Sequence, residues 1–144
     1  MRGYDGSKQV TGRKRHIVVD TLGLLLMVVV HAANISEDEG AKLVFQQFLG
    51  VFTRLRLIWA DAGYKREIIW WVIAYCPWTL EIIKRPRGAQ AFILLPRRWV
   101  VERTFAWLGR YRRLSKDYEQ LPEVSESWIY LVMIHLMTRR LAHA

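Results

Sequence analysis

The stretch RLRLIWADAGY, residues 54–64, decides the fold class, because an apolar run here ends in an acidic turn that contains glycine. The run predicts a strand over residues 54–60. In open α/β sheets, ligands and catalytic groups collect at the carboxyl ends of strands, which is where Asp61 stands. Aspartate is also a common turn and helix-cap residue. Taken alone, this position favours a structural role for Asp61 in the turn, and a catalytic role is the alternative.

Outward from this strand, the sequence predicts alternating strands and helices. Two β-rich runs around Gly23 predict a hairpin, and their nearly continuous apolar character indicates that at least one strand is covered on both faces. The last helix is apolar on nearly every face, which predicts a buried core helix. The order of elements predicts a mixed α/β fold. The expected elements are a polar, basic, glycine-rich segment at 2–15, strands at 16–20 and 24–31, a helix from the Ser36 cap to about Phe48, a helix at 66–75, a strand at 80–84, and helices at 97–108 and 123–142.

The composition indicates one folded, basic domain. Of the 144 residues, 52% are hydrophobic, which is enough to build a core. Lysine and arginine number 22 against 13 acids, and the resulting charge of +9 favours nucleic acid over an acidic membrane surface as partner. The single Cys76 excludes an intrachain disulfide, and no Cys/His cluster has zinc-ligand spacing. Without a signal-peptide core or an apolar run near ~20 residues, we expect a cytoplasmic protein that does not enter a membrane.

Glu102 is the second candidate for chemistry. On the expected helix, an apolar stripe is formed by Val101, Phe105 and Leu108, and Glu102 lies about 100° from its centre. A carboxylate at such a border can reach inward to a metal ion or outward to Arg98, one turn away. The second arrangement would be a helix salt bridge worth ~0.2–0.5 kcal/mol. Spacing alone leaves both interpretations open.

Glu102 lies within a dense run of cations. Six of the seventeen residues from 97 to 113 are arginine, and only one is acidic. Arginine suits phosphate because its planar fork can bind two oxygens at once. The alternative is a solvated helix face. A lone acid in a basic stripe can hold a divalent ion against DNA phosphate, so the pattern favours a nucleic-acid site.

Three segments resemble transposases of the insertion sequence 5 group, which are DDE transposases. They read GRKRHIVVDTLG at 12–23, LIWADAGY at 57–64, and LPRRWVVERTFAWLGRYRRL at 95–114. The resemblance covers essentially the whole chain. It implies a ribonuclease H-like fold, a mixed sheet flanked by helices, in which Asp, Asp and Glu side chains hold two Mg²⁺ or Mn²⁺ ions.

By this resemblance, Asp61 is the second acid and Glu102 the third, and both are catalytic residues and metal ligands. The ions would activate the attacking oxygen and stabilise the leaving one at phosphorus. Water first frees a DNA 3′ end, whose hydroxyl then attacks target DNA. The implied partner is DNA, as transposon ends and as target, at the nucleoid of the bacterial cytoplasm. The cations expected to bind it are Arg13, Lys14, Arg15, Lys84, Arg85, Arg97, Arg98, Arg103, Arg110, Arg112 and Arg113.

The chain departs from this family where the first acid belongs. In the family that acid lies on a first, central strand, and neither Asp5 nor Asp20 matches its position. Residues 1–144 are therefore expected to form a single partial catalytic domain, truncated at the N-terminus, with exposed sheet edges and no activity alone. The upstream transposase polypeptide or a second copy of the chain is the expected partner. Leu95 and Gly109 also stand where related elements carry tyrosine and lysine.

Two other functions remain open. A non-catalytic DNA-binding transposase fragment that acts in trans would keep the basic surface and need neither Asp61 nor Glu102. A metal-dependent nuclease of the same fold would hydrolyse DNA without strand transfer.

Overall fold

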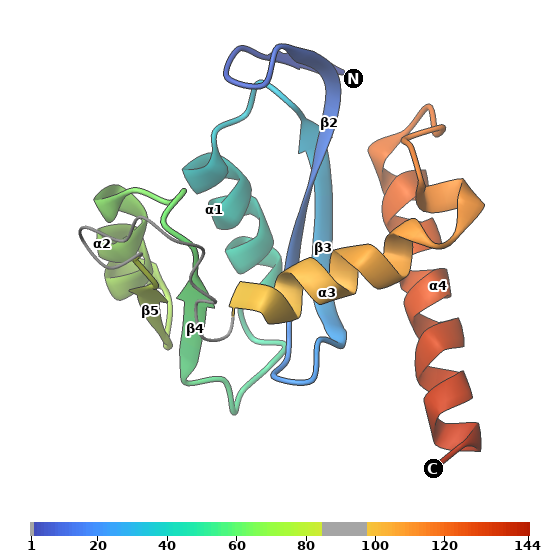
Figure 1. Ribbon diagram of the computed structural model, residues 1–144. Coiled ribbons are helices and arrows are strands. Elements are labelled where there is room, and N and C mark those ends of the chain that lie inside the picture. Colours follow the sequence, from blue (N-terminus) through green and yellow to red (C-terminus); the bar gives the residue numbers. More distant parts are fainter. Residues whose placement is uncertain (1, 85–97) are drawn as a thin grey trace, which may run out of the picture.

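The computed structural model describes residues 2–84 and 98–144. Within them, the predicted strands and helices follow one another in the predicted order after one additional short strand, and the mixed α/β class is confirmed (Figure 1). The elements are β1 (Gly3–Asp5), β2 (Val10–Val19), β3 (Leu25–Ala32), α1 (Glu37–Phe48), β4 (Leu57–Ala60), α2 (Arg66–Tyr75), β5 (Thr79–Ile82), α3 (Arg98–Gly109), the short 3-10 helix η1 (Arg112–Leu114) and α4 (Pro122–Ala142).

The described strands form two separate sheets. β1, β2 and β3 make an antiparallel sheet with β2 in the centre, and β4 and β5 make a parallel pair. The β2–β3 turn is held by Asp20, whose carboxylate accepts hydrogen bonds from the backbone N–H groups of Leu22 and Leu24, each at 2.9 Å. Gly23 in this turn has a φ of +84°, the left-handed region that favours glycine. The predicted hairpin is confirmed.

The β2–β3 hairpin separates two hydrophobic clusters. Val29 packs with residues of α1, α2 and β5, whereas Val28 and Val30 pack with residues of α3 and α4. Successive side chains of a strand point to opposite faces, so β3 contributes to both clusters. Figure 1 shows α1 and α4 on opposite sides of the hairpin. The prediction of a strand that is covered on both faces is confirmed.

Residues 2–15 were predicted to precede the first strand, but the structure places strands within them. β1 lies within residues 2–15, and β2 begins at Val10 rather than at His16. The cations Arg13, Lys14 and Arg15 therefore lie within β2 and not in a segment that precedes it. They are tolerated because acidic side chains and carbonyl oxygens of other elements pair with them.

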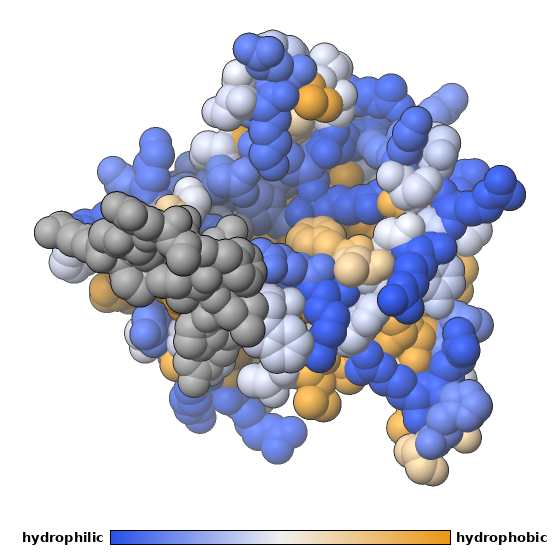
Figure 2. Space-filling view, viewed as in Figure 1, coloured by the Kyte–Doolittle hydropathy of each residue, from blue (hydrophilic) through white to orange (hydrophobic). Residues whose placement is uncertain are grey.

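Helix α4 is not buried on every face, so this prediction is wrong. Ile129 and Met133 are buried, but Leu131, Ile134 and Leu141 are 54%, 59% and 77% exposed. The helix packs on β3 with one face and leaves the opposite face open. Figure 2 shows apolar side chains between hydrophilic ones over α4, at the lower right. Among the described helices, none combines the length and the apolar character that crossing a membrane requires.

Candidate active site and nucleic-acid interface

Asp61 follows the last residue of β4 and begins a tight turn. Its Oδ1 accepts the backbone N–H of Gly63 at 2.9 Å. A Cβ at Gly63 would lie 3.0 Å from that oxygen, so a residue without a side chain suits this turn. The Asp61 side chain itself is exposed. The structural role and the candidate catalytic role of Asp61 are therefore compatible, because the turn bond orients the carboxylate at the strand end.

Helix α3 carries Glu102 and is fixed to the β2–β3 turn. The Thr104 hydroxyl, fully buried, donates to the carbonyl oxygen of Gly23 at 2.6 Å. One residue earlier, Arg103 Nη2 donates to the carbonyl oxygen of Leu22 at 2.7 Å. These two bonds position the exposed Glu102 relative to the hairpin.

The buried face of α3 differs from the predicted stripe. Val100, Thr104 and Leu108 are the buried residues, whereas Val101 is half-buried and Phe105 is exposed. Val101 and Phe105 line a cavity instead of packing in the core. The predicted apolar stripe is therefore confirmed only for Leu108, which is buried in the core. Val101 and Phe105 belong to a neighbouring face of α3 that lines the cavity.

Asp61 and Glu102 line the same cavity, which has a volume of about 240 Å³. Its walls come from β2, α1, β4, β5 and α3, and most of them are apolar: Ile17, Val18, Ala41, Val44, Phe45, Ile58, Ala60, Leu80, Ile83, Val101 and Phe105. The structure thus places both candidate acids on the walls of one cavity. Within residues 2–84 and 98–144, no group of three or more His, Cys, Asp or Glu side chains has metal-binding geometry.

A buried histidine pair lies at the same cavity. His16 Nδ1 is 2.7 Å from His31 Nε2, and the rings stack with centroids 4.8 Å apart. His31 Nδ1 is 2.9 Å from the carbonyl oxygen of Ala32, which can only accept, so His31 Nδ1 carries the proton. His31 Nε2 then accepts a hydrogen bond from His16 Nδ1–H. His31 is thus a buried, hydrogen-bonded core residue, whereas His135 of α4 is exposed.

The pKa of His16 is lowered to about 4, first because burial disfavours the charged ring and then because His31 is adjacent. His16 Nε2 lies 3.1 Å from Glu37 Oε2 but without hydrogen-bond geometry. Burial, together with nearby carboxylates, raises the pKa of the Tyr64 hydroxyl. The sequence analysis missed this cluster. The hairpin register could have revealed it, since Lys14 stands opposite His31, which makes His16 and His31 diagonal neighbours.

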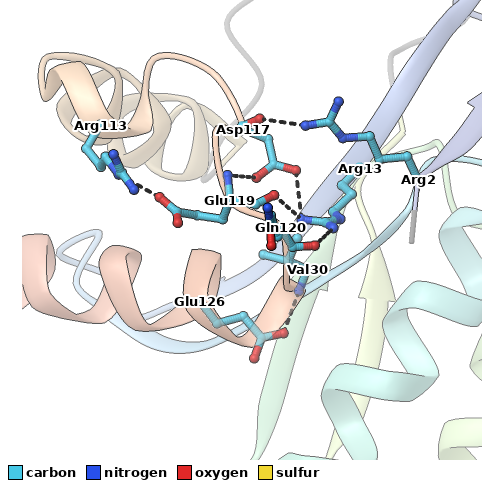
Figure 3. A network of polar contacts seen from close by, with 8 residues as sticks. All are labelled: Arg2, Arg13, Val30, Arg113, Asp117, Glu119, Gln120 and Glu126. Carbon is cyan, nitrogen blue, oxygen red and sulfur yellow. Dashed lines mark hydrogen bonds and ion pairs between the residues drawn. The ribbon is translucent and has the colours of Figure 1, made fainter.

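Several predicted DNA-binding cations are engaged inside the protein. Arg13 Nη1 lies 3.2 Å from Asp117 Oδ2 and donates to the carbonyl oxygen of Glu119 at 3.0 Å, and Arg13 Nη2 donates to the carbonyl oxygen of Gln120 (Figure 3). Arg113 Nε donates to Glu119 Oε1 at 2.6 Å. The Arg13 side chain is only 2% exposed. Its contacts hold the loop before α4 against the sheet.

Lys14 and Arg15 also have internal partners. Lys14 Nζ lies 3.2 Å from carboxylate oxygens of both Asp5 and Glu37. Arg15 Nη1 donates to the carbonyl oxygen of Leu114 at 3.0 Å. These contacts connect β2 to the segments around it, a structural role that the sequence analysis did not anticipate.

Aromatic rings support the cations of α3. The Arg103 guanidinium lies 4.5 Å from the ring centroid of Trp99 and 4.7 Å from that of Trp107, and Arg140 of α4 stacks on Trp107 at 4.3 Å. Such stacking fixes the planar donor fork that suits phosphate. Among the remaining predicted cations, Lys84, Arg110 and Arg112 are exposed, and Arg113 is exposed as well despite its contact with Glu119. Arg85, Arg97 and the Arg98 side chain lie outside the described residues.

The family model described as the transposase DDE domain matches residues 1–137. The chain belongs to the transposase DDE domain family. This transposase domain is also similar to a transposase for insertion sequence element IS402 of Burkholderia cepacia, with 29% identity over 137 residues that cover 83% of the chain. No solved structure matches it significantly.

The transposase domain spans 60% of the length of the IS402 relative. The predicted relation to DDE transposases of insertion sequences is confirmed at the level of the family. Its assignment to the insertion sequence 5 group stays a prediction.

Proposed function

We propose that this chain is part of the catalytic domain of an insertion-sequence transposase, and that the complete domain cuts and joins DNA at the cavity lined by Asp61 and Glu102. The observation that carries the proposal is that these two acids, from different elements, meet at one cavity beside the carboxyl end of β4. A ribonuclease H-like arrangement would use such a strand end for catalysis. We place this function on bacterial DNA in the cytoplasm.

The acids fit a hard divalent cation. Mg²⁺ is usually held by one or two carboxylates together with substrate phosphates, and Asp61 and Glu102 offer carboxylate oxygens at a shared, accessible cavity. Mg²⁺ or Mn²⁺ bound there would stabilise the charge that develops on the oxygens around phosphorus. Two ions are expected in the complete site.

The protein groups contribute orientation and charge. The Gly63 N–H holds the Asp61 carboxylate, and the Thr104–Gly23 bond holds α3, so both carboxylates are placed before substrate arrives. Exposed Arg110 and Arg112 would bind DNA phosphates next to this helix. The substrate backbone would then lie across α3, with a scissile phosphate at the two acids.

The described residues supply only two of the three acids that the family uses, which motivates the second part of the proposal. The chain alone is inactive, and a further carboxylate comes from another segment, either of the transposase polypeptide or of a second copy. A non-catalytic DNA-binding fragment is the competing function, and it fits the same shortage of acids. A nuclease of the same fold would cleave DNA without joining it.

Mn²⁺ binding tests the site directly. Titration of the purified chain, followed by the loss of the free Mn²⁺ signal in electron paramagnetic resonance, should show one weak site. Asp61→Asn or Glu102→Gln should remove it. Glu67→Gln, at an exposed carboxylate of α2 outside the cavity, is the matched control and should bind as the parent does. Equal Mn²⁺ binding by all four proteins would contradict the proposed site.

A further inference from the structure

The histidine pair leaves one ring nitrogen of His16 with a lone pair and no proton. His31 Nδ1–H donates to the carbonyl oxygen of Ala32 at 2.9 Å, and His31 Nε2 accepts from His16 Nδ1–H at 2.7 Å. Burial lowers the pKa of His16, which is 7% exposed, so its ring is neutral. A neutral ring with its proton on Nδ1 carries a lone pair on Nε2. Among the described residues, none forms a hydrogen bond with this nitrogen.

The lone pair of His16 Nε2 lies next to a carboxylate. Glu37, the first residue of α1, places its Oε2 3.1 Å from His16 Nε2, without hydrogen-bond geometry. Both atoms are acceptors, so they repel each other unless a positive charge lies between them. A shared proton needs donor and acceptor in line, whereas two ligands of one metal ion meet at an angle. The arrangement therefore favours a metal ion over a proton.

The separation of the two atoms fits two ligands of one metal ion. Bonds from Zn²⁺ to imidazole nitrogen and to carboxylate oxygen are about 2.1 Å long. At angles from about 90° to 110°, such bonds hold the two ligand atoms roughly 3.0–3.4 Å apart. The 3.1 Å between His16 Nε2 and Glu37 Oε2 lies in this range. The two side chains can thus bind an ion from where they already stand.

The neighbours of His16 fix the direction of its lone pair. A metal-binding histidine usually donates its other ring N–H to an acceptor, which sets the tautomer and the orientation of the ring. His31 is that acceptor for His16, and the carbonyl oxygen of Ala32 orients His31 in turn. The backbone of α1 packs against both rings, because a Cβ at Gly40 would lie 2.5 Å from His16 Cε1 and 2.6 Å from His31 Nε2. The nitrogen is therefore oriented before an ion arrives.

The charges around this nitrogen also suit a divalent cation. Lys14 Nζ lies 3.2 Å from carboxylate oxygens of both Asp5 and Glu37, so one positive charge stands beside two negative ones. Glu37 contacts Lys14 through Oε1 and turns its Oε2 toward His16. These four residues line a cavity of about 700 Å³. The cavity gives an ion access to the nitrogen and leaves room for water ligands.

We propose that His16 Nε2 and Glu37 Oε2 bind a divalent transition-metal cation of the zinc type. No group of three or more His, Cys, Asp or Glu side chains in the described part of the chain has metal-binding geometry, so water completes the coordination. Imidazole suits Zn²⁺, whereas Mg²⁺ and Mn²⁺ prefer carboxylate and water. The site thus differs in its chemistry from Asp61 and Glu102, and it does not rest on the proposed function. A bound ion would join the start of α1 to β2.

Calorimetric titration of the purified chain with Zn²⁺ tests the site. Glu37→Gln keeps the shape of a half-exposed side chain and should weaken Zn²⁺ binding by more than about tenfold, since even outer partners of a metal-binding histidine contribute roughly 10–100-fold. Glu39→Gln, at an exposed acid in the same turn of α1, is the matched control and should bind as the parent does. Equal Zn²⁺ binding by the parent and Glu37→Gln overturns the proposal, and so does a parent that binds no Zn²⁺.

A double variant separates this site from the proposed catalytic site. Asp61→Asn combined with Glu102→Gln should lose Mn²⁺ binding and keep the Zn²⁺ binding that Glu37→Gln loses. Zn²⁺ binding that disappears in the double variant and persists in Glu37→Gln would place the ion at Asp61 and Glu102, which overturns the proposal. A parent chain that binds Zn²⁺ at His16 but no Mn²⁺ would support this site and contradict the catalytic one.

Nitrogen NMR of histidine-labelled chain identifies the ligand atom. His16 Nε2 should be unprotonated without metal, and its resonance should move when Zn²⁺ is added. His16→Asn should abolish binding, whereas His135→Asn, at an exposed histidine of α4, should leave it unchanged. Should His16→Asn fail to fold, Glu37→Gln and the His16 resonance still decide. A proton on His16 Nε2, or Zn²⁺ shifts confined to His135 and His143, overturns the proposal.

Discussion

The hydroxyl of Thr104 donates to the carbonyl oxygen of Gly23 at 2.6 Å, across 81 residues of sequence. The bond is buried, and it joins the helix that carries Glu102 to the turn of the central hairpin. Gly23 also has no space for a side chain, because a Cβ there would lie 2.9 Å from Thr104 Oγ1. The position of Glu102 thus depends on the β2–β3 turn, which is distant from α3 in the sequence and adjacent to it in the fold.

Replacement of Thr104 by valine tests this dependence. Thr104→Val keeps the shape but leaves the Gly23 carbonyl unpaired, and we expect a loss of about 1–3 kcal/mol in the free energy of unfolding. Thr138→Val in α4 is the matched control, since Thr138 bonds only to the carbonyl oxygen of Ile134 at an exposed position. Urea unfolding followed by circular dichroism measures both. Equal losses in the two variants would show that the bond to Gly23 contributes nothing of its own.

Gly40 of α1 should resist the usual helix-stabilising change to alanine. A Cβ at Gly40 would lie 2.5 Å from His16 Cε1 and 2.6 Å from His31 Nε2. Overpacking costs about 1–3 kcal/mol, more than the ~1 kcal/mol gained from alanine in a helix. Gly40→Ala should therefore destabilise the domain in chemical denaturation. Gly109→Ala, where nothing lies within 4 Å of the new Cβ, should not. A more stable Gly40→Ala variant would mean that the histidine pair moves freely.

The stability of the domain should fall in mild acid because of His16. Its pKa is about 4 in the folded chain against 6.5 for an unperturbed histidine. Above pH 6.5 the His16 ring is neutral in both the folded and the unfolded chain, so its full contribution to the free energy of unfolding is present. Between 6.5 and 4 the unfolded chain takes up a proton that the folded chain resists, so stability is lost as pH falls, by at most about 1.4 kcal/mol per pH unit for one proton. Lys14, His31, Glu37 and Tyr64 face the same ring.

Unfolding free energies at a series of pH values measure this loss. His16→Asn should flatten the pH dependence, whereas His143→Asn, at the exposed end of the chain, should leave the slope as it is. A slope that is unchanged by His16→Asn would assign the proton uptake to another group.

The two acids should be indispensable for strand transfer but not for folding. In the complete transposase, Asp61→Asn and Glu102→Gln should each reduce the joining of a pre-cut transposon end to target DNA to background. Asparagine can still accept the Gly63 N–H, so the turn survives. Glu67→Gln should retain full activity. Normal strand transfer by either acid variant would remove both residues from the active site.

The sequence predicts some features of this domain well because they are local. Ser36 accepts the backbone N–H of Glu39 at 3.2 Å, as the capping pattern indicates, and the apolar run before Asp61 forms β4. Features that depend on distant partners were missed. The start of β2 was placed too late because Arg13 is neutralised by the loop near Asp117, which only the fold brings close. Likewise, the composition of α4 could not show which face packs on β3.

The exposed arginines after α3 should carry the electrostatic part of DNA binding. Each phosphate neutralised on duplex DNA contributes about −0.9 to the slope of log K against log salt, so Arg110→Ala and Arg112→Ala should each make the slope shallower by roughly 0.9. Arg13→Ala should act differently. Its side chain is buried against Asp117, so the variant should lose stability and, where still folded, keep the parent slope.

Fluorescence anisotropy with a labelled duplex over a range of salt concentrations gives these slopes. Glu67→Gln, remote from α3, serves as the reference for a change in net charge alone. A slope near zero in the parent chain would contradict DNA binding altogether. If Arg13→Ala changed the salt slope more than Arg112→Ala does, the DNA would lie on β2 and not on the helix that carries Glu102.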